Sequence, residues 1–294
     1  MCCELCEGSQ EARDAFQEAD DVLGLPLSRL CFEGPSDELR QTINSQPAIL
    51  TASVAYLRAT PELNGLMRPH FVAGHSLGEY TALIAAGVLD FASALRLVRE
   101  RGRLMQEAGE IEPGSMAAII GLDPETVEQV CLETAAQIAN INCPGQIVVS
   151  GKREAVANAM DLAQARGAVG TVALEVSGAF HSELMRPAIE GMNQAISDTD
   201  FRTPEIPIIA NASAMPITTV EEVKEELIRQ LCSCVRWQPS IEYMAESGVT
   251  TYIEIGPGIV LTKLIKRIVR KAKVLNMNDA EDIRALEAER SSPA

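Results

Sequence analysis

A serine flanked by glycines, in the stretch FVAGHSLGEYTALIAAGVLD at residues 71–90, is the first group in this sequence suited to chemistry. Gly74, Ser76 and Gly78 form a G-x-S-x-G pattern between an apolar run and a helical one, which predicts a sharp turn from strand to helix. Such a turn holds the serine hydroxyl above the sheet edge, and both glycines are expected to give it room. The backbone N–H of Leu77 is then expected to face an oxyanion at the start of the helix.

A serine needs a base before it attacks a carbonyl carbon, and the sequence offers three histidines. His70 precedes the strand at an R-P-H corner, and His75 neighbours the serine on a turn whose successive side chains diverge. His181, in SGAFHSELM, is therefore the base by elimination. The alternatives are a histidine that only opens a helix and a G-x-S-x-G pattern that arises by chance at Ser76.

The composition excludes several classes of protein. The 294 residues are 47% hydrophobic and contain no Ser/Gly/Pro-rich linker, so they can bury one large core, or a core with a small satellite. No apolar stretch approaches the roughly 18 residues of a bilayer span, and the first residues lack the signal-peptide pattern, so a cytoplasmic protein without membrane association is expected. A net charge of −16 argues against nucleic acid as a partner.

One segment departs from this acidic balance. It contains six of the 25 basic residues within eleven positions, namely Lys263, Lys266, Arg267, Arg270, Lys271 and Lys273. It is interpreted either as a solvated helix face or as a docking patch for an acidic partner or a phosphorylated substrate.

Eight cysteines raise the question of a metal site or disulfides. They include one CxxC pair, Cys3 and Cys6, one CxC pair and no second CxxC. Structural zinc sites usually need four ligands in paired clusters, so no metal site is predicted and reduced thiols are expected.

The apolar periodicity predicts an α/β protein in two parts. For the larger part it predicts helices at 9–23, 37–58 (reset near Pro47), from the serine turn to Ala86, 91–107 and near 219–232, and strands at 70–73, 207–211 and 251–255.

Between residues 115 and 176 the predicted order is strand, helix, strand, strand, helix, strand, which is typical of an inserted ferredoxin-like βαββαβ subdomain. We therefore expect a large α/β domain at 1–112 and 178–294, with a mostly parallel sheet and a hydrolase-like core, and a small domain at 113–177.

Several motifs together resemble one family. They are GHSLGEY at 74–80, RGRLMQ at 101–106, NCPGQIVVSG at 142–151, SGAFHSELM at 177–185, and the run CVRWQPSIEYM that leads to IEIGPG. In this order they resemble the malonyl-CoA:acyl carrier protein transacylase family, the acyltransferase family of fatty acid synthesis, from about residue 9 almost to the C-terminus.

The resemblance implies that Ser76 attacks the malonyl thioester to form malonyl-Ser76, and that His181 acts as base and then as acid. A backbone carbonyl at the position that matches Gln230 would orient the imidazole in place of a carboxylate. Arg101 would bind the free malonyl carboxylate, since a guanidinium makes two parallel charge-assisted bonds to it. An ordinary arginine on a helix face is the alternative for Arg101.

The resemblance also implies a substrate preference. Phe180 matches the bulky ring of the malonyl-selective version, which disfavours an α-methyl branch. Asn142 and Gln146 are expected to line the pocket, although a turn role in Asn-Cys-Pro-Gly explains them equally well. The implied partners are malonyl-CoA, as substrate, and acyl carrier protein, with no metal or other cofactor, and we expect a monomer.

The start of the chain departs from the family pattern. Met1 falls where the family has passed an apolar strand and a G-Q-G-S-Q motif, so a central strand and a second oxyanion donor are expected to be absent, a loss typically worth about 10² to 10³-fold in turnover. The alternatives are thus a truncated, weakly active or non-catalytic remnant that binds carrier protein, or a serine hydrolase. A hydrolase keeps Ser76 and His181 but has no use for Arg101, and the sequence assigns no carboxylate partner to its histidine.

Overall fold

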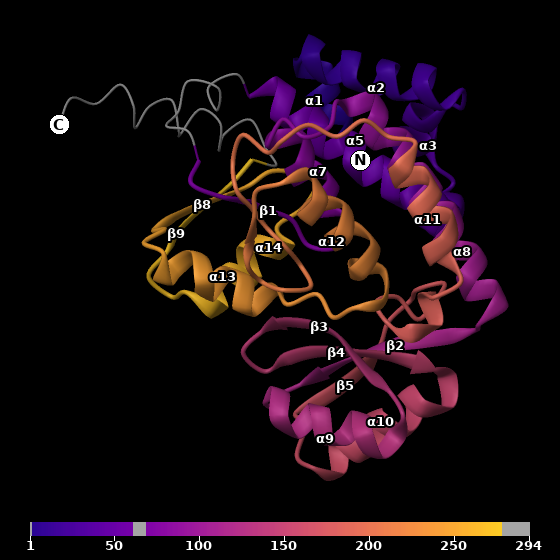
Figure 1. Cartoon of the computed structure of the whole chain (residues 1–294), viewed down its shortest axis with the longest axis vertical. Coiled ribbons are helices and arrows are strands. Elements are labelled where there is room, and N and C mark those ends of the chain that lie inside the picture. Colours follow the sequence, from indigo (N-terminus) through magenta and orange to yellow (C-terminus); the bar gives the residue numbers. More distant parts are fainter. Residues whose placement is uncertain (1, 61–68, 278–294) are drawn as a thin grey trace.

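The structure is a computed structural model that describes residues 2–60 and 69–277 of an α/β protein. Figure 1 shows N-terminal helices at one end of the long axis, a small α/β unit at the other, and the C-terminal elements between them. The helices are α1 (Cys3–Gly8), α2 (Gln10–Leu23), α3 (Leu27–Glu33), α4 (Ser36–Arg40), α5 (Thr42–Ala59), α7 (Gly78–Ala85), α8 (Phe91–Ile111), α9 (Pro124–Thr134), α10 (Arg153–Ala165), the 3₁₀ turn η1 (Glu183–Met185), α11 (Ala188–Ser197), α12 (Val220–Cys232), α13 (Trp237–Glu246) and α14 (Val260–Ile268). The strands are β1 (Val72–Ala73), β2 (Gly114–Ile120), β3 (Gln137–Cys143), β4 (Gln146–Lys152), β5 (Gly170–Ala173), β6 (Ile208–Ile209), β7 (Pro216–Ile217), β8 (Thr251–Glu254) and β9 (Lys273–Asn276).

No helix within the described ranges is both long and apolar enough to cross a membrane.

The helix break expected near Pro47 lies elsewhere. The segment 37–58 divides at Gln41, between α4 and α5, and Pro47 lies inside α5. A proline at this position leaves the carbonyl of Ile43 without its usual amide donor. The Nη1 group of Arg99 donates to that carbonyl at 2.7 Å, so a side chain from α8 replaces the lost hydrogen bond and the helix continues.

α8 packs closely against α5 at Gly102. A Cβ atom at Gly102 would lie 2.8 Å from the carbonyl oxygen of Thr42 and 2.9 Å from the Cα atom of Ile43, so no larger residue fits without a shift of backbone. This close approach lets the neighbouring Arg101 reach across to α5, where its Nη1 group donates to Gln46 Oε1 at 2.6 Å.

The expected mostly parallel sheet is not found among the described residues. β1 pairs in parallel with β6, Ala73 opposite Ile209, but β6 pairs antiparallel with β7, and β8 and β9 form a separate parallel pair. The reason lies in the loop after β6, where the chain reverses at once and the N–H of Ala210 donates to the carbonyl of Met215 at 3.0 Å. A reversal this tight returns the chain as an antiparallel neighbour.

The small unit contains β2, α9, β3, β4, α10 and β5 in that order, and its strands form an antiparallel sheet ordered β3-β4-β2-β5. Alternate residues of β2 face opposite sides of the sheet. Ala117 and Ile119 join a core with α9 and α10, whereas Met116 and Ala118 join a second cluster that Phe180 packs against. Phe180 also packs against the core of the large part, so this ring lies where the two parts meet.

Candidate active site

β1 leads into a strained turn that presents Ser76. Ser76 has φ 52°, in the left-handed region, which costs a non-glycine residue about 1–3 kcal/mol. Its own N–H donates to Asn211 Oδ1 at 2.7 Å, whereas the N–H of Leu77 donates to no group in the described part of the chain. The Leu77 amide, at the start of α7, is therefore the one open to an oxyanion.

The two glycines of the turn differ in their importance. A Cβ atom at Gly74 would lie 2.0 Å from the carbonyl carbon and oxygen of Gly78, so only glycine fits there. A Cβ atom at Gly78 would meet nothing within 4 Å. The expectation that both glycines give the turn its room is therefore right for Gly74 and wrong for Gly78.

His181 is the histidine that the fold brings to the serine. Its Nε2 atom lies 2.7 Å from Ser76 Oγ, and its Nδ1 atom lies 2.8 Å from the backbone oxygen of Gln230. Gln230 lies in the last turn of α12, where helix carbonyls lack an intrahelical donor, so this oxygen is available to the imidazole. A carbonyl oxygen only accepts, so Nδ1 carries the hydrogen and Nε2 is left to accept the serine proton.

The electrostatics of the site keep His181 neutral. Burial lowers the pKa of His181 to about 3, the positive charge of Arg101 lowers it as well, and the hydrogen bond to Gln230 opposes both. A neutral imidazole is the form that can act as a general base at neutral pH.

The other two histidines do not contact Ser76 Oγ. His75 Nε2 donates to Asn142 Oδ1 at 2.9 Å, and its ring lies 5.7 Å from that of Trp237. His70 is exposed. The structure thus places Asn142 against the residue that precedes the serine, with its side-chain oxygen bonded to His75.

Arg101 is buried beside the serine without a carboxylate partner. Arg101 is 1% exposed. Its Nη2 group lies 3.2 Å from Ser76 Oγ and 2.7 Å from Gln230 Oε1. Together with Gln46, these contacts are all to neutral oxygens, and no ion pair to Arg101 occurs among residues 2–60 and 69–277. The Nε atom of Arg101 is buried and has no described partner. The guanidinium therefore has no ion-pair partner and a donor at Nε without a hydrogen bond, and its carbon atom lies 5.5 Å from the centre of the Tyr80 ring.

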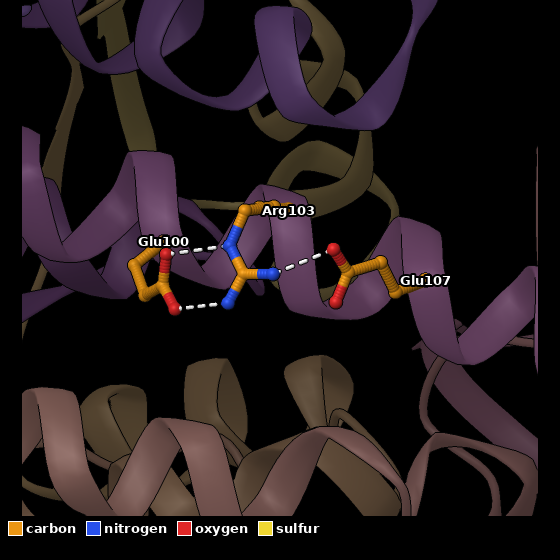
Figure 2. A network of polar contacts seen from close by, with 3 residues as sticks. All are labelled: Glu100, Arg103 and Glu107. Atoms are coloured by element: carbon orange, nitrogen blue, oxygen red, sulfur yellow. Dashed lines mark hydrogen bonds and ion pairs between the residues drawn. The ribbon is translucent and has the colours of Figure 1, made fainter.

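A second arginine on α8 shows the ordinary arrangement. Figure 2 shows Arg103 between Glu100 and Glu107, with 2.5 Å contacts to a carboxylate on either side. The Arg103 side chain is 41% exposed, so these pairs are surface ion pairs of small energetic weight. Arg101 lies two residues away, on the buried side of the same helix, and the interpretation as an ordinary surface arginine fits Arg103 instead.

Three polar residues of the site were not predicted: Gln46, Glu79 and Asn211 are all buried. Asn211 follows β6, the parallel neighbour of the strand that leads to Ser76, and polar residues after adjacent parallel strands meet at one sheet edge. That rule could have identified Asn211. No comparable signal marks Gln46 or Glu79, because each lies in a helix whose sequence pattern does not distinguish a buried polar residue from a surface one.

The basic side chains of residues 263–273 are exposed, and they lie on α14, in the turn after it and at the start of β9. Arg267 donates to Gln146 Oε1 at 2.8 Å and to the carbonyl of Pro144 at 2.9 Å, in the turn between β3 and β4. Gln146, for which the sequence left a pocket role and a turn role open, joins α14 to the small unit at the start of β4. Both interpretations of the basic segment, as solvated face or docking patch, stay predictions.

The described residues contain no cluster of three or more His, Cys, Asp or Glu side chains that could hold a metal ion. No disulfide links the eight cysteines, all of which lie in the described ranges.

The strand–turn–helix that presents Ser76, with a histidine bonded to the hydroxyl, is the arrangement of a serine acyl-transfer site. The family model described as acyl transferase domain matches residues 1–289, and the chain belongs to this family.

Individual relatives have more specific names. The chain is 46% identical over 285 residues to the malonyl CoA-acyl carrier protein transacylase of Bacillus subtilis (strain 168), covering 95% of this chain and 89% of that protein. The same name belongs to a relative in Escherichia coli (strain K12), 43% identical over 270 residues, with 90% and 87% covered. The resemblance inferred from the sequence motifs is thus confirmed.

Solved structures of malonyl transferases superpose closely on this chain. The acyl-carrier-protein-S-malonyltransferase from Bartonella henselae superposes with a TM-score of 0.94 at 43% identity, covering 99% of this chain and 95% of that one. A malonyl-transacylase in complex with its type II PKS acyl-carrier protein also gives a TM-score of 0.94, at 41% identity, with 98% and 94% covered.

The steric difference between the two turn glycines is testable. Gly74→Ala is expected to lower the free energy of unfolding by about 3 kcal/mol, because the added methyl group meets backbone that cannot move aside. Gly78→Ala, the matched control, is expected to be neutral or slightly stabilising at the start of α7. Urea unfolding followed by circular dichroism measures both, and equal midpoints for the two variants would contradict the assigned difference.

Burial of a neutral histidine makes stability depend on pH. The pKa of His181 is lowered on folding, so the unfolded chain binds a proton below about pH 6.5 that the folded chain does not, and stability is lost as pH falls through that range. Between pH 6.5 and 5, urea unfolding of the wild type is expected to show a slope steeper by up to about 1.4 kcal/mol per pH unit than that of His181→Gln. Parallel curves would show that His181 is not buried in its neutral form.

Proposed function

We propose that this chain transfers a malonyl group from malonyl-CoA to the phosphopantetheine thiol of acyl carrier protein in fatty acid biosynthesis, through a malonyl-Ser76 intermediate. The observation that carries the proposal is the buried guanidinium of Arg101, which lies 3.2 Å from Ser76 Oγ and lacks a described carboxylate partner. The relatives match nearly the whole chain, and they are named as malonyl transferases, which supports the same assignment.

In the first half-reaction, Ser76 Oγ attacks the thioester carbonyl carbon of malonyl-CoA while its proton passes to His181 Nε2. The tetrahedral oxyanion accepts a hydrogen bond from the free N–H of Leu77. When the carbon–sulfur bond breaks, the sulfur of CoA takes the proton from His181 and leaves as a thiol. The serine then carries the malonyl ester.

The second half-reaction reverses these roles. The phosphopantetheine thiol gives its proton to His181 and attacks the ester carbonyl, and Ser76 leaves with that proton as the carbon–oxygen bond breaks. The carrier protein then holds the malonyl thioester. These steps use only side chains and the backbone of this chain, with malonyl-CoA as substrate and no other cofactor.

We assign Arg101 to the free carboxylate of the malonyl group. A carboxylate can accept two parallel hydrogen bonds from a guanidinium, and burial strengthens such a pair. An acetyl group offers no carboxylate and leaves the buried charge unpaired, which is the kind of mismatch that gives large discrimination. Phe180, which precedes His181, is assigned to limit space for a branched acyl group, and Asn142, bonded to His75, to the wall of the pocket.

The serine hydrolase alternative is less well supported. His181 Nδ1 is oriented by a backbone carbonyl of α12 and not by an Asp or Glu in the described part of the protein. A hydrolase of the usual triad type has a carboxylate at that position, and it has no use for a buried arginine beside its serine.

We propose, further, a large hydrolase-like domain at 1–112 and 178–294 and a ferredoxin-like domain at 113–177. The strand order β3-β4-β2-β5 and a core formed within the small unit support this division. NMR spectra of the isolated segment 113–177 would test it, since an independent domain gives dispersed shifts. The cytoplasmic location and the monomeric state stay predictions.

The covalent intermediate can be detected directly. After brief mixing with malonyl-CoA, intact-mass spectrometry is expected to show one added malonyl group on the wild-type chain and none on Ser76→Ala. The variant loses only the nucleophilic oxygen, so circular dichroism should show an unchanged fold. An adduct of equal yield on Ser76→Ala would place the nucleophile elsewhere.

The assignment of Arg101 to the malonyl carboxylate can be tested by comparing malonyl-CoA with acetyl-CoA. Arg101→Ala is expected to lower acylation of Ser76 by malonyl-CoA by about 100-fold or more, because the substrate loses a buried charged partner. Reaction with acetyl-CoA should be spared or raised. The matched control is Arg103→Ala, which removes an exposed arginine from the same helix and is expected to change neither rate by more than about twofold. Equal losses for both donors in Arg101→Ala would refute the carboxylate role.

A further inference from the structure

Glu79 is a buried carboxylate to which the reaction above gives no role. It lies in the first turn of α7 and is 1% exposed. Its Oε1 atom accepts hydrogen bonds from the backbone N–H of Asn211 at 2.9 Å and from the Asn211 side-chain amide at 3.1 Å. Its Oε2 atom accepts from Gln230 Nε2 at 2.5 Å. One carboxylate thus fixes two side-chain amides.

Those two amides in turn make hydrogen bonds to the turn around Ser76 and to Arg101. Asn211 accepts from the Ser76 N–H and donates to the Gly74 carbonyl, at 2.7 Å each, which fixes the strained turn. Gln230 donates to the Ser76 carbonyl at 3.0 Å and accepts from Arg101 Nη2 at 2.7 Å. Ser76 and Arg101 therefore each lie two hydrogen bonds from Glu79.

The position of Gln230 between Glu79 and Arg101 is informative. A carboxylate in direct contact with Arg101 would form an ion pair and neutralise the guanidinium. Here the Gln230 amide separates them, with its NH₂ group toward Glu79 and its oxygen toward Arg101. An ionised carboxylate only accepts hydrogen bonds, so it requires this orientation of the amide, as the Ser76 carbonyl and Arg101 also do. Arg101 is then held by neutral oxygens and keeps its charge.

The hydrogen-bond donors around Glu79 favour its ionised form, against the effect of burial. Burial, and then the charge of Glu226, raise the pKa of Glu79 well above its usual range. However, each hydrogen bond that the described residues make to its oxygens comes from an N–H donor, and a proton on either oxygen would face one of these donors. The three donors, and the positive charge of Arg101 beyond Gln230, stabilise the anion.

We propose that Glu79 is a positioning residue for malonyl selectivity. It holds the side-chain amides of Gln230 and Asn211 in place, and through Gln230 it positions Arg101 with its charge left for the substrate carboxylate. The proposal rests on the function proposed above and adds the group that orients the specificity arginine.

The structure dictates what Glu79→Gln does. The backbone N–H of Asn211 is a fixed donor, so the new amide must keep its oxygen there and turn its NH₂ group toward Gln230. Two NH₂ groups then face one another, and the hydrogen bond between residue 79 and Gln230 is lost. Gln230 gains nothing by turning its amide over, because its NH₂ group also donates to the Ser76 carbonyl and its oxygen accepts from Arg101. Repulsion between the two NH₂ groups displaces the Gln230 side chain, and the guanidinium of Arg101 loses a contact that orients it.

The experiment measures acylation of Ser76 by malonyl-CoA and by acetyl-CoA with the full-length chain, using rapid mixing and intact-mass spectrometry. Glu79→Gln is expected to reduce the preference for malonyl over acetyl by about tenfold or more, mainly through a higher KM for malonyl-CoA. The matched control is Glu226→Gln. Glu226 is also a buried glutamate, but it accepts from the Ala212 N–H and a glutamine keeps an oxygen for that bond, so the preference should stay unchanged.

A second variant separates charge placement from hydrogen-bond pairing, and it remains informative if Glu79→Gln unfolds. Glu79→Gln with Gln230→Glu restores a donor facing an acceptor between the two residues, gives up the donor to the Ser76 carbonyl, keeps the backbone carbonyl for His181, and forms an ion pair with Arg101. We expect its thermal stability to exceed that of Glu79→Gln while the malonyl preference stays low. Restored preference in this swap would overturn the proposal, as would an unchanged preference in Glu79→Gln. A wild-type chain that is not acylated by malonyl-CoA would overturn the proposed function and this inference with it.

Discussion

The buried charge of Arg101 is the constraint on which the rest of the site depends. Removing a guanidinium from water costs several kcal/mol unless an anion or many hydrogen bonds compensate it. The described residues supply amide and hydroxyl oxygens at 2.6 to 3.2 Å, and hold the nearest buried carboxylate one amide away. The free protein thus tolerates a charge that it does not neutralise, and under the proposed function an anionic acyl group completes the site.

The fold delivers these oxygens from segments far apart in the sequence. The parallel pair β1 and β6 brings Ser76 and Asn211 to one sheet edge, and the close contact at Gly102 brings Arg101 to Gln46 of α5. The last turn of α12 supplies both the side chain and the backbone oxygen of Gln230. The helix is fixed at its other end by a capping box, in which the Thr219 hydroxyl accepts from Glu222 N–H and the Glu222 carboxylate accepts in return from the Thr219 N–H.

Local pattern was enough to predict part of this arrangement. The turn at Ser76 depends on neighbours in sequence, so the G-x-S-x-G spacing predicted it, and family resemblance placed His181, Arg101 and Gln230 where the structure brings them together. Glu79 was missed because its partners lie 132 and 151 residues away, and in sequence it looks like any glutamate in a first helical turn. The break at Gln41 and the antiparallel β7 were missed for a related reason: a long-range hydrogen bond from Arg99 rescues the helix at Pro47, and two-residue strands carry no periodicity.

The same charge links substrate choice to the chemistry of the base. Arg101 is the second cause, after burial, of the low pKa of His181, so in the free protein the imidazole is a weak base beside an uncompensated cation. A malonyl carboxylate paired with Arg101 removes most of that repulsion, and the imidazolium that forms as Ser76 attacks is then less destabilised. An acetyl group leaves the repulsion in place. Under the proposed function, a correct substrate therefore gains twice from one contact: it binds more tightly, and it makes His181 a stronger base at the moment when the serine proton is transferred.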